Sequence, residues 1–253
     1  MSVVTEQHGS VLIVTLDRPS RHNVVDVEMM AGIGGALADA ESDDSVAAIV
    51  ITGTGERMFC AGLDLKAFAA GGARRPVGGP GLEVLLERTY PKPIVGAANG
   101  SAFAVGFELL LACDLIVAAD HATFGIPEVK RGLVAAGGGI SLLPRRIPLA
   151  IALEMGLTGE PLDAVRAHSL GLVNRVVPAE RVRDEAVGLA ESIAANAPLA
   201  VRFTKEHMYS AVAGDESARR RMHELSQDVF ASVDAKEGAQ AFVERRKPVW
   251  RGQ

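Results

Sequence analysis

The chain has 253 residues, a formal net charge of −5 and 48% hydrophobic residues, which suffices for a sizeable core. This charge argues against a nucleic-acid-binding scaffold, because neutralising phosphates requires a basic surface. Cys60 and Cys113 are flanked by apolar residues and predict reduced thiols in a cytoplasmic protein. We expect no export signal, because the N-terminal residues lack a basic start followed by an apolar core. We also expect no membrane span, because the longest apolar run, 109–119, includes Asp114 and is much shorter than the roughly 20 residues needed to cross a bilayer.

Short runs rich in β-branched residues and bounded by Gly, Pro, Asp or Asn predict buried strands, at 11–16, 47–52, 93–97 and 114–118. Helical patterns lie between these runs, at 26–41, 82–89 and 106–112. Such alternation, with near-continuous apolar strands, predicts an α/β fold in which helices cover the sheets.

After Pro178 the pattern is helical only, over 179–196, 198–213, 216–232 and 235–246. Because proline ends the last strand-like run, we divide the chain into a core of residues 1–178 and a helical region of residues 179–253. The segment 71–81 is rich in glycine and proline. It predicts either a flap over an active site or a long surface connection.

Two glutamates stand at turn-rich edges of apolar segments. Glu108 follows the small-residue stretch 99–106, and Glu128 follows Pro127. Two carboxylates that converge on one apolar pocket can position a water from both sides, one taking its proton and the other returning a proton to carbon. That is hydratase chemistry. The alternative is that both are ordinary exposed glutamates at helix starts.

These segments, together with 58–66 and 132–139, resemble the crotonase family, also called enoyl-CoA hydratase/isomerase, and the motifs occur in the family's order. The resemblance implies a spiral of strand-strand-helix repeats followed by a C-terminal helical region that forms a homotrimer or a hexamer. It implies an acyl-CoA thioester as substrate, with coenzyme A as part of that substrate. We expect no other cofactor, no metal, and no nucleic-acid or membrane partner.

The resemblance assigns roles to four residues. Leu63 and Val105 would supply the two backbone N–H donors of an oxyanion hole, Glu108 would deprotonate water, and Glu128 would protonate the α-carbon. The family usually has glycine where this chain has Val105. A backbone donor survives any side chain except proline, but valine would be strained by about 1–3 kcal/mol if that position required a positive φ.

The same resemblance implies a coenzyme A site. Ala61, Asp64 and Lys66 belong to the motif that carries the first oxyanion donor, with Lys66 near the phosphates, where Arg21 is a second candidate. Phe242 and Arg245 match a terminal motif that contacts the adenine end of coenzyme A across a subunit boundary. Solvated basic side chains and helix packing are the alternatives. The glycines at 137–139 predict close packing at a helix start, or N–H groups free to bind an anion.

The leading hypothesis is therefore an enoyl-CoA hydratase, a carbon-oxygen lyase that adds water reversibly to trans-2-enoyl-CoA, as in fatty acid β-oxidation. A crotonobetainyl-CoA hydratase is an alternative suggested by 106–109, 127–132 and 143–148, although aromatic residues, at 4%, leave little for a quaternary-ammonium cage. An enoyl-CoA isomerase, which generally needs one carboxylate, and a non-catalytic acyl-CoA binding protein are further alternatives.

Overall fold

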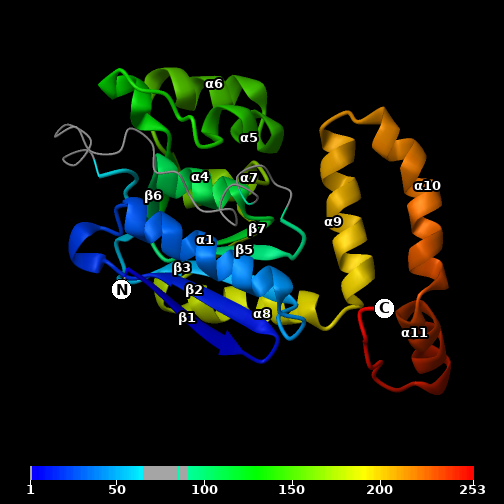
Figure 1. Cartoon of the computed structure of the whole chain (residues 1–253). Coiled ribbons are helices and arrows are strands. Elements are labelled where there is room, and N and C mark those ends of the chain that lie inside the picture. The colour runs from blue at the N-terminus through cyan, green and yellow to red at the C-terminus, as the bar shows by residue number, and fades with distance from the viewer. Residues whose placement is uncertain (1, 65–84, 86–89) are drawn as a thin grey trace.

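The structure is a computed structural model that describes residues 2–64, 85 and 90–253 (Figure 1). The larger of its two sheets has the strand order β1-β2-β3-β5-β7-β10. Its strands are β1 (Val3–His8), β2 (Val11–Leu16), β3 (Ala48–Gly53), β5 (Ile94–Ala98), β7 (Leu115–Ala119) and β10 (Arg175–Val177). The smaller sheet contains β4 (Met58–Cys60), β6 (Ser101–Phe103), β8 (Thr123–Gly125) and β9 (Leu162–Asp163), in that order.

The α-helices that precede the last three are α1 (Val27–Ser42), α4 (Val105–Ala112), α5 (Gly139–Arg146), α6 (Leu149–Thr158), α7 (Ala164–Ser169) and α8 (Val182–Ala194). Short 3-10 helices occupy Pro19–Arg21, Pro127–Arg131 and Ala179–Arg181. The chain ends in α9 (Pro198–Val212), α10 (Glu216–Ala231) and α11 (Val233–Glu244). No described helix has the length and apolar character needed to cross a membrane.

The four predicted strands are confirmed as β2, β3, β5 and β7, and neighbours among them pair in parallel. Every residue of β5 is buried, as expected of a strand covered on both faces. Figure 1 shows α1 above the larger sheet and α8 below it in this view. The predicted helix at 82–89 and the segment 71–81 lie outside the described residues, apart from the buried Leu85.

The expected spiral is confirmed by how successive strands divide between the sheets. The first strand of each turn (β3, β5, β7) joins the larger sheet, and the second (β4, β6, β8) joins the smaller one. The first strands begin at Ala48, Ile94 and Leu115. These intervals are unequal, so the repeat leaves no fixed period in the sequence.

Adjacent turns of the spiral meet at Asn99 and Gly100, between β5 and β6. The Gly53 N–H donates to Asn99 Oδ1 at 3.0 Å, and Asn99 Nδ2 donates to the Gly55 carbonyl at 2.6 Å. A β-carbon on Gly100 would lie 2.4 Å from the Arg57 carbonyl carbon, so only glycine lets the two backbones approach this closely. This corner sets where β4 and β6 pair.

The C-terminal helices extend away from the sheets, with α9 and α10 side by side (Figure 1). The tail after α11 folds back on them. Asp234 accepts hydrogen bonds from the Arg251 and Gly252 N–H groups at 2.7 and 2.9 Å, and Trp250 Nε1 donates to the Ala195 carbonyl at 2.7 Å. Glu237 binds the Arg246 guanidinium and the Val249 N–H. We call residues 246–253 the C-terminal strap, because they connect α11 to the end of α8.

Candidate active site

The site lies at one edge of the smaller sheet. Strands β4, β6 and β8 are parallel neighbours, so their carboxyl ends meet at the same edge. Leu63, Val105 and Glu128 follow those three ends within two or three residues. The fold thus brings together residues that lie far apart in the sequence, at the kind of edge where α/β sheets usually bind ligands.

The Leu63 N–H points away from the neighbouring strand segment. Leu63 forms an isolated parallel bridge with Val25, in which the Val25 N–H donates to the Gly62 carbonyl at 2.8 Å and the Asp64 N–H donates to the Val25 carbonyl at 3.2 Å. In a parallel bridge the residue between those two bonds directs its own N–H to the opposite side. The Leu63 N–H is therefore available to an incoming group.

Val105 is the first residue of α4, where backbone N–H groups have no partner within the helix. Val105 does not carry the backbone strain that a positive φ would cause, because its φ is not positive. The positive φ falls one residue earlier, at Ala104, with φ 52° and ψ −129°. The helix begins at Val105 rather than at the predicted Gly106, and this shifts the unusual backbone onto Ala104. The Val105 side chain packs against the hydrophobic core.

Glycines bring the two proposed oxyanion donors together. A β-carbon on Gly62 would lie 3.7 Å from the Val105 nitrogen, and Gly62 itself has a φ of +99°. A β-carbon on Gly106 would lie 2.4 Å from the Cys60 carbonyl oxygen, so α4 starts in direct contact with the end of β4. The Ala104 N–H binds the Gly125 carbonyl at 2.9 Å and ties this turn to β8.

Glu108 lies in the first turn of α4 and is only 1% exposed. The alternative of an exposed helix-start glutamate is therefore wrong for this residue. Its Oε1 accepts a hydrogen bond from the Gly139 N–H at 2.9 Å. Gly139 is the first residue of α5, and a helix N-terminus favours a negative charge. The carboxylate is thus buried next to a group that stabilises its ionised form.

Glu128 differs from Glu108 in the surroundings of its carboxyl group. Its Oε2 is buried and has no hydrogen-bond partner among the described residues. Burial raises the pKa of this carboxyl, the Glu128 backbone N–H opposes the rise, and the charge of Glu108 raises the pKa further. Arg131 lowers it only in part. The two glutamates are therefore close enough to interact, with Glu108 suited to accept a proton and Glu128 suited to hold one.

The structure brings together three of the residues expected at coenzyme A, Arg21, Ala61 and Asp64, but Phe242 and Arg245 lie elsewhere in the chain. Arg21 forms an ion pair with Asp64, and the Ala61 N–H donates to the His22 carbonyl at 3.0 Å. Lys66 lies outside the described residues. Phe242 and Arg245 lie on or just after α11, which Figure 1 shows beyond α9 and away from α4.

Three features of the site were not assigned from the sequence. The sequence leaves Gly139 open between close packing and binding of an anion, and the structure shows its N–H bound to the Glu108 side chain and its Cα packed close to Ala135. Ala104 gave no signal, since small residues are common in turns. Asn23 is fully buried, with a φ of 51°, and its Nδ2 donates to the Phe59 and Thr54 carbonyls at 3.0 Å, which holds β4 in place.

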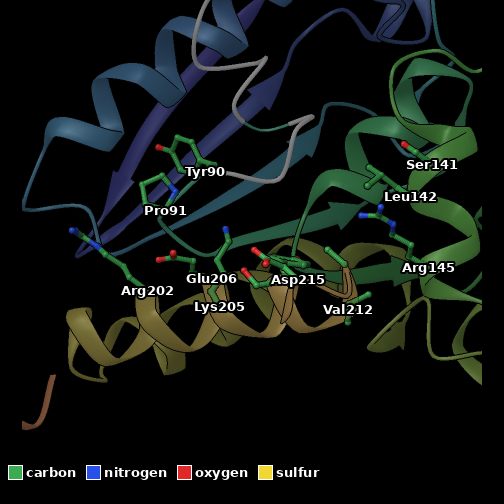
Figure 2. Close-up of a pocket in the computed structure, with 13 residues that line it drawn as sticks. Tyr90, Pro91, Ser141, Leu142, Arg145, Arg202, Lys205, Glu206, Val212 and Asp215 are labelled. Atoms are coloured by element: carbon green, nitrogen blue, oxygen red, sulfur yellow. The ribbon is translucent and has the colours of Figure 1, made fainter. Parts of the chain in front are cut away.

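A separate cavity of about 680 Å³ lies between α5 and α9. Glu108 and Glu128 do not line it. Figure 2 shows Arg202 and Arg145 at opposite ends of the lining, with Glu206 between them. No described group of three or more His, Cys, Asp or Glu residues could hold a metal ion. The cavity therefore lies where α9 packs against the rest of the protein, and it is separate from the site of Glu108 and Glu128.

Beside this cavity a largely buried ion pair ties α9 to the larger sheet. Asp114 accepts hydrogen bonds from Lys205 Nζ at 2.8 Å, from Tyr209 Oη at 2.6 Å and from the Ile94 N–H at 2.7 Å. The Asp114 and Lys205 side chains are 15% and 13% exposed. Lys205 also donates to the Lys92 carbonyl at 2.7 Å. We call Asp114, Lys205 and Tyr209 the α9 anchor.

Comparisons with known proteins identify the family and the fold. The family model for enoyl-CoA hydratase/isomerase matches residues 6–253. The carnitinyl-CoA dehydratase of Citrobacter koseri is 41% identical over 255 residues, covering 98% of this chain and 97% of that protein. The crystal structure of an enoyl-CoA hydratase from Mycobacterium tuberculosis H37Rv is 47% identical with a TM-score of 0.93, covering 100% of this chain and 99% of that one. The carnitinyl-CoA hydratase structure from Mycobacterium avium is 41% identical with a TM-score of 0.79 and the same coverage. The chain therefore belongs to the enoyl-CoA hydratase/isomerase family, the crotonases.

Proposed function

We propose that the protein adds and removes water at the C2–C3 double bond of a coenzyme A thioester. The observation that carries this proposal is the glutamate pair, in which Glu108 is buried on a helix N-terminus and Glu128 has a buried, unpartnered oxygen with a raised pKa. An isomerase would use one of these groups. A binding protein without turnover would need neither, so the pair disfavours both alternatives.

The proposed reaction assigns one step to each group. Glu108 takes a proton from water as the water oxygen bonds to C3. The electron pair of the double bond shifts toward the thioester, whose carbonyl oxygen becomes the enolate oxygen. The Leu63 and Val105 N–H groups stabilise that oxygen, and loss of one such donor typically costs about 3–4 kcal/mol of transition-state stabilisation. Glu128 then donates its proton to C2, and dehydration runs through the same steps in reverse.

Within this reaction, we propose a carnitine-type substrate first, carnitinyl-CoA and its dehydration product crotonobetainyl-CoA. Curated relatives from Citrobacter koseri and Proteus mirabilis, at 41% and 42% identity over nearly the whole chain, are named carnitinyl-CoA dehydratase. A straight-chain trans-2-enoyl-CoA is the second candidate, favoured by the enoyl-CoA hydratase structure at 47% identity. The two differ by a quaternary ammonium group at the end of the acyl chain.

The two substrates can be compared directly with purified protein. Loss of the enoyl-thioester absorbance is followed for crotonobetainyl-CoA and for crotonyl-CoA at equal concentrations. A higher kcat/KM for crotonobetainyl-CoA supports the first candidate, and a higher value for crotonyl-CoA supports the second. Glu108→Gln and Glu128→Gln should each lower kcat for both substrates by about 100-fold or more, which leaves a residual rate that can be measured. If the wild type hydrates neither these nor longer enoyl-CoA esters, the proposed function is wrong.

We also propose that the protein assembles as a homotrimer. Large apolar side chains are exposed on the C-terminal helices, among them Met208, Phe230 and Phe242 at 66%, 73% and 84%, and such exposure is typical of surfaces that bind a partner. Light scattering after size exclusion should give three times the 26.5 kDa of one chain. Six times that mass would indicate paired trimers, and a single-chain mass would contradict the proposal.

For coenzyme A, we propose that Phe242 and Arg245 bind the adenine end from a neighbouring subunit, with Lys66 and Arg21 near the phosphates. Phe242→Ala should raise the KM for the coenzyme A thioester several-fold. It should leave the KM for the matching pantetheine thioester unchanged, because that analogue lacks the adenosine diphosphate portion. Equal effects on both analogues would contradict a contact with adenine.

A further inference from the structure

Each glycine of residues 137–139 stands in a different relation to its surroundings. Gly138 has a φ of +119° and caps the N-terminus of α5. Gly137 and Gly139 have no positive φ, so their backbones could carry alanine. Their lack of a side chain therefore needs a reason other than backbone conformation.

Gly137 leaves room for the carboxylate of Glu108. A β-carbon at this position would lie 2.6 Å from Glu108 Oε2, 3.1 Å from its Cδ and 3.4 Å from its Oε1. Those are the three nearest atoms, and all belong to the same carboxylate. Any side chain at 137 would therefore push on Glu108.

Gly139 fixes the other side of the same group. Its N–H donates to Glu108 Oε1 at 2.9 Å. A β-carbon on it would lie 2.7 Å from the Ala135 β-carbon and 3.1 Å from Glu108 Oε1. The carboxylate therefore lies against the start of α5, where it accepts the Gly139 N–H and where an added β-carbon would have no space.

We propose that residues 137–139 form a positioning turn for Glu108, which fixes the orientation of its carboxylate toward the reacting water. This inference rests on the proposed function and adds Gly137 and Gly139 to the residues that determine its rate. They touch no substrate and act through Glu108. Glu108 sits on α4, whose first turn carries Val105, so the turn also fixes the carboxylate relative to the oxyanion hole.

The test is Gly137→Ala. The added methyl group meets only the end of a flexible side chain, so the protein should fold normally while the carboxylate moves. Because misplacement of a reacting group by about 1 Å can cost about 100-fold in rate, kcat should fall about 10- to 100-fold with little change in KM. Gly188→Ala in α8 is the matched control, since nothing lies within 4 Å of a β-carbon there, and its kcat should be unchanged.

A double-mutant cycle separates positioning from a general structural effect. In a Glu108→Gln background, where the base is already lost, Gly137→Ala should lower the residual rate less than about 2-fold. An equal fall in both backgrounds, or an unchanged kcat in the single variant, would overturn the proposal.

The crystal structure of Gly137→Ala tests the turn without any turnover. It should show the Glu108 carboxylate displaced from the Gly139 N–H. If the wild type hydrates no thioester, the proposed function fails, and the position of this carboxylate alone then decides whether the turn holds it. An unmoved carboxylate would overturn the inference.

Discussion

A β-carbon on Gly62 would lie 2.8 Å from the Ala104 β-carbon. The two segments that carry the Leu63 and Val105 N–H groups therefore pack against each other with no room for an added atom. The distance between the two proposed donors depends on this contact, because both donors are backbone N–H groups and their positions follow from how the two backbone segments pack.

Gly62→Ala should lower both stability and rate. Its φ of +99° disfavours any L side chain, which costs about 1–3 kcal/mol, and the new methyl group would push the Ala104 turn away. We expect a lower free energy of unfolding by denaturant titration and a kcat at least 10-fold lower, up to the roughly 100- to 1,000-fold that loss of an oxyanion donor costs. A normal kcat would show that the contact does not set the separation of the donors.

Ala104→Gly should stabilise the protein by up to about 1 kcal/mol, because glycine tolerates the backbone at φ 52° and ψ −129° better than alanine does. Ala38→Gly is the matched control, since Ala38 is exposed within α1 and glycine in a helix interior costs about 1 kcal/mol. The two substitutions should therefore change the free energy of unfolding in opposite directions. A loss of stability in both would contradict backbone strain at Ala104.

Glu128→Gln should inactivate the enzyme and stabilise it at neutral pH. Burial raises the folded-state pKa of this carboxyl above its ordinary value of 4.5. Between the two values the folded state holds the proton that the unfolded state has lost, so stability falls as pH rises through this window. Glutamine removes that loss, and we expect a gain of about 1 kcal/mol near pH 7 with a kcat lower by about 100-fold or more.

The gain from Glu128→Gln should shrink as pH falls toward 4.5, because the wild-type carboxyl is then increasingly protonated in the unfolded state as well as in the folded one. Thermal melts of the two proteins between pH 4.5 and 8 measure this directly. A difference in melting temperature that is constant over that range would show that the gain does not come from this carboxyl. In the hydration direction, the wild-type rate should decline as pH rises through the raised pKa of Glu128.

Asp114→Asn should loosen α9. It removes the charge that pairs with Lys205 in a nearly buried site, and a hydrogen bond to a charged group contributes about 1.5–3 kcal/mol. We expect a loss of that size, with faster hydrogen exchange in α9. Glu160→Gln is the control, because its pair with Lys130 is exposed and should contribute at most about 1 kcal/mol. Equal losses would contradict the special role of the α9 anchor.

Glu237→Gln should release the C-terminal strap. Arg246 and the Val249 N–H lower the pKa of Glu237 from 4.5 to about 2, so its contribution is present above pH 4.5 and is lost as pH falls toward 2. Trp250 is the only tryptophan, and its emission reports the strap. At pH 7 the variant should show a red-shifted emission, whereas Glu180→Gln, at an exposed glutamate, should not. A wild-type spectrum in Glu237→Gln would contradict this contact.

The sequence could predict the elements whose pattern is strong. The apolar runs of β2, β3, β5 and β7 are recognisable from their composition, and the helical pattern at 26–41 becomes α1, which Asp26 caps by accepting from the Met29 N–H at 3.0 Å. Strands β4, β6 and β8 were missed, because three residues are too few to show a period. The glutamate pair was found through the motifs around it, since a glutamate by itself gives no sign of burial.

What could not be predicted depends on contacts between distant segments. The position of the unusual φ depends on whether α4 starts at residue 105 or 106, and boundaries of that kind are set by packing. The use of Gly137 depends on Glu108, which is 29 positions away and lies on α4. A glycine-rich run can therefore be recognised in a sequence, but the residues that it contacts in the fold cannot.

The spiral makes the reaction centre independent of the length of the segments between its turns. Leu63, Val105 and Glu128 follow the ends of three paired strands, and the spacing of those strands, about 4.8 Å per step, does not depend on how much chain connects one turn to the next. The connection from β4 to β5 could therefore lengthen, shorten or change composition while the hydrogen-bond donors kept their places. A protein built this way can acquire a new substrate without rebuilding its chemistry.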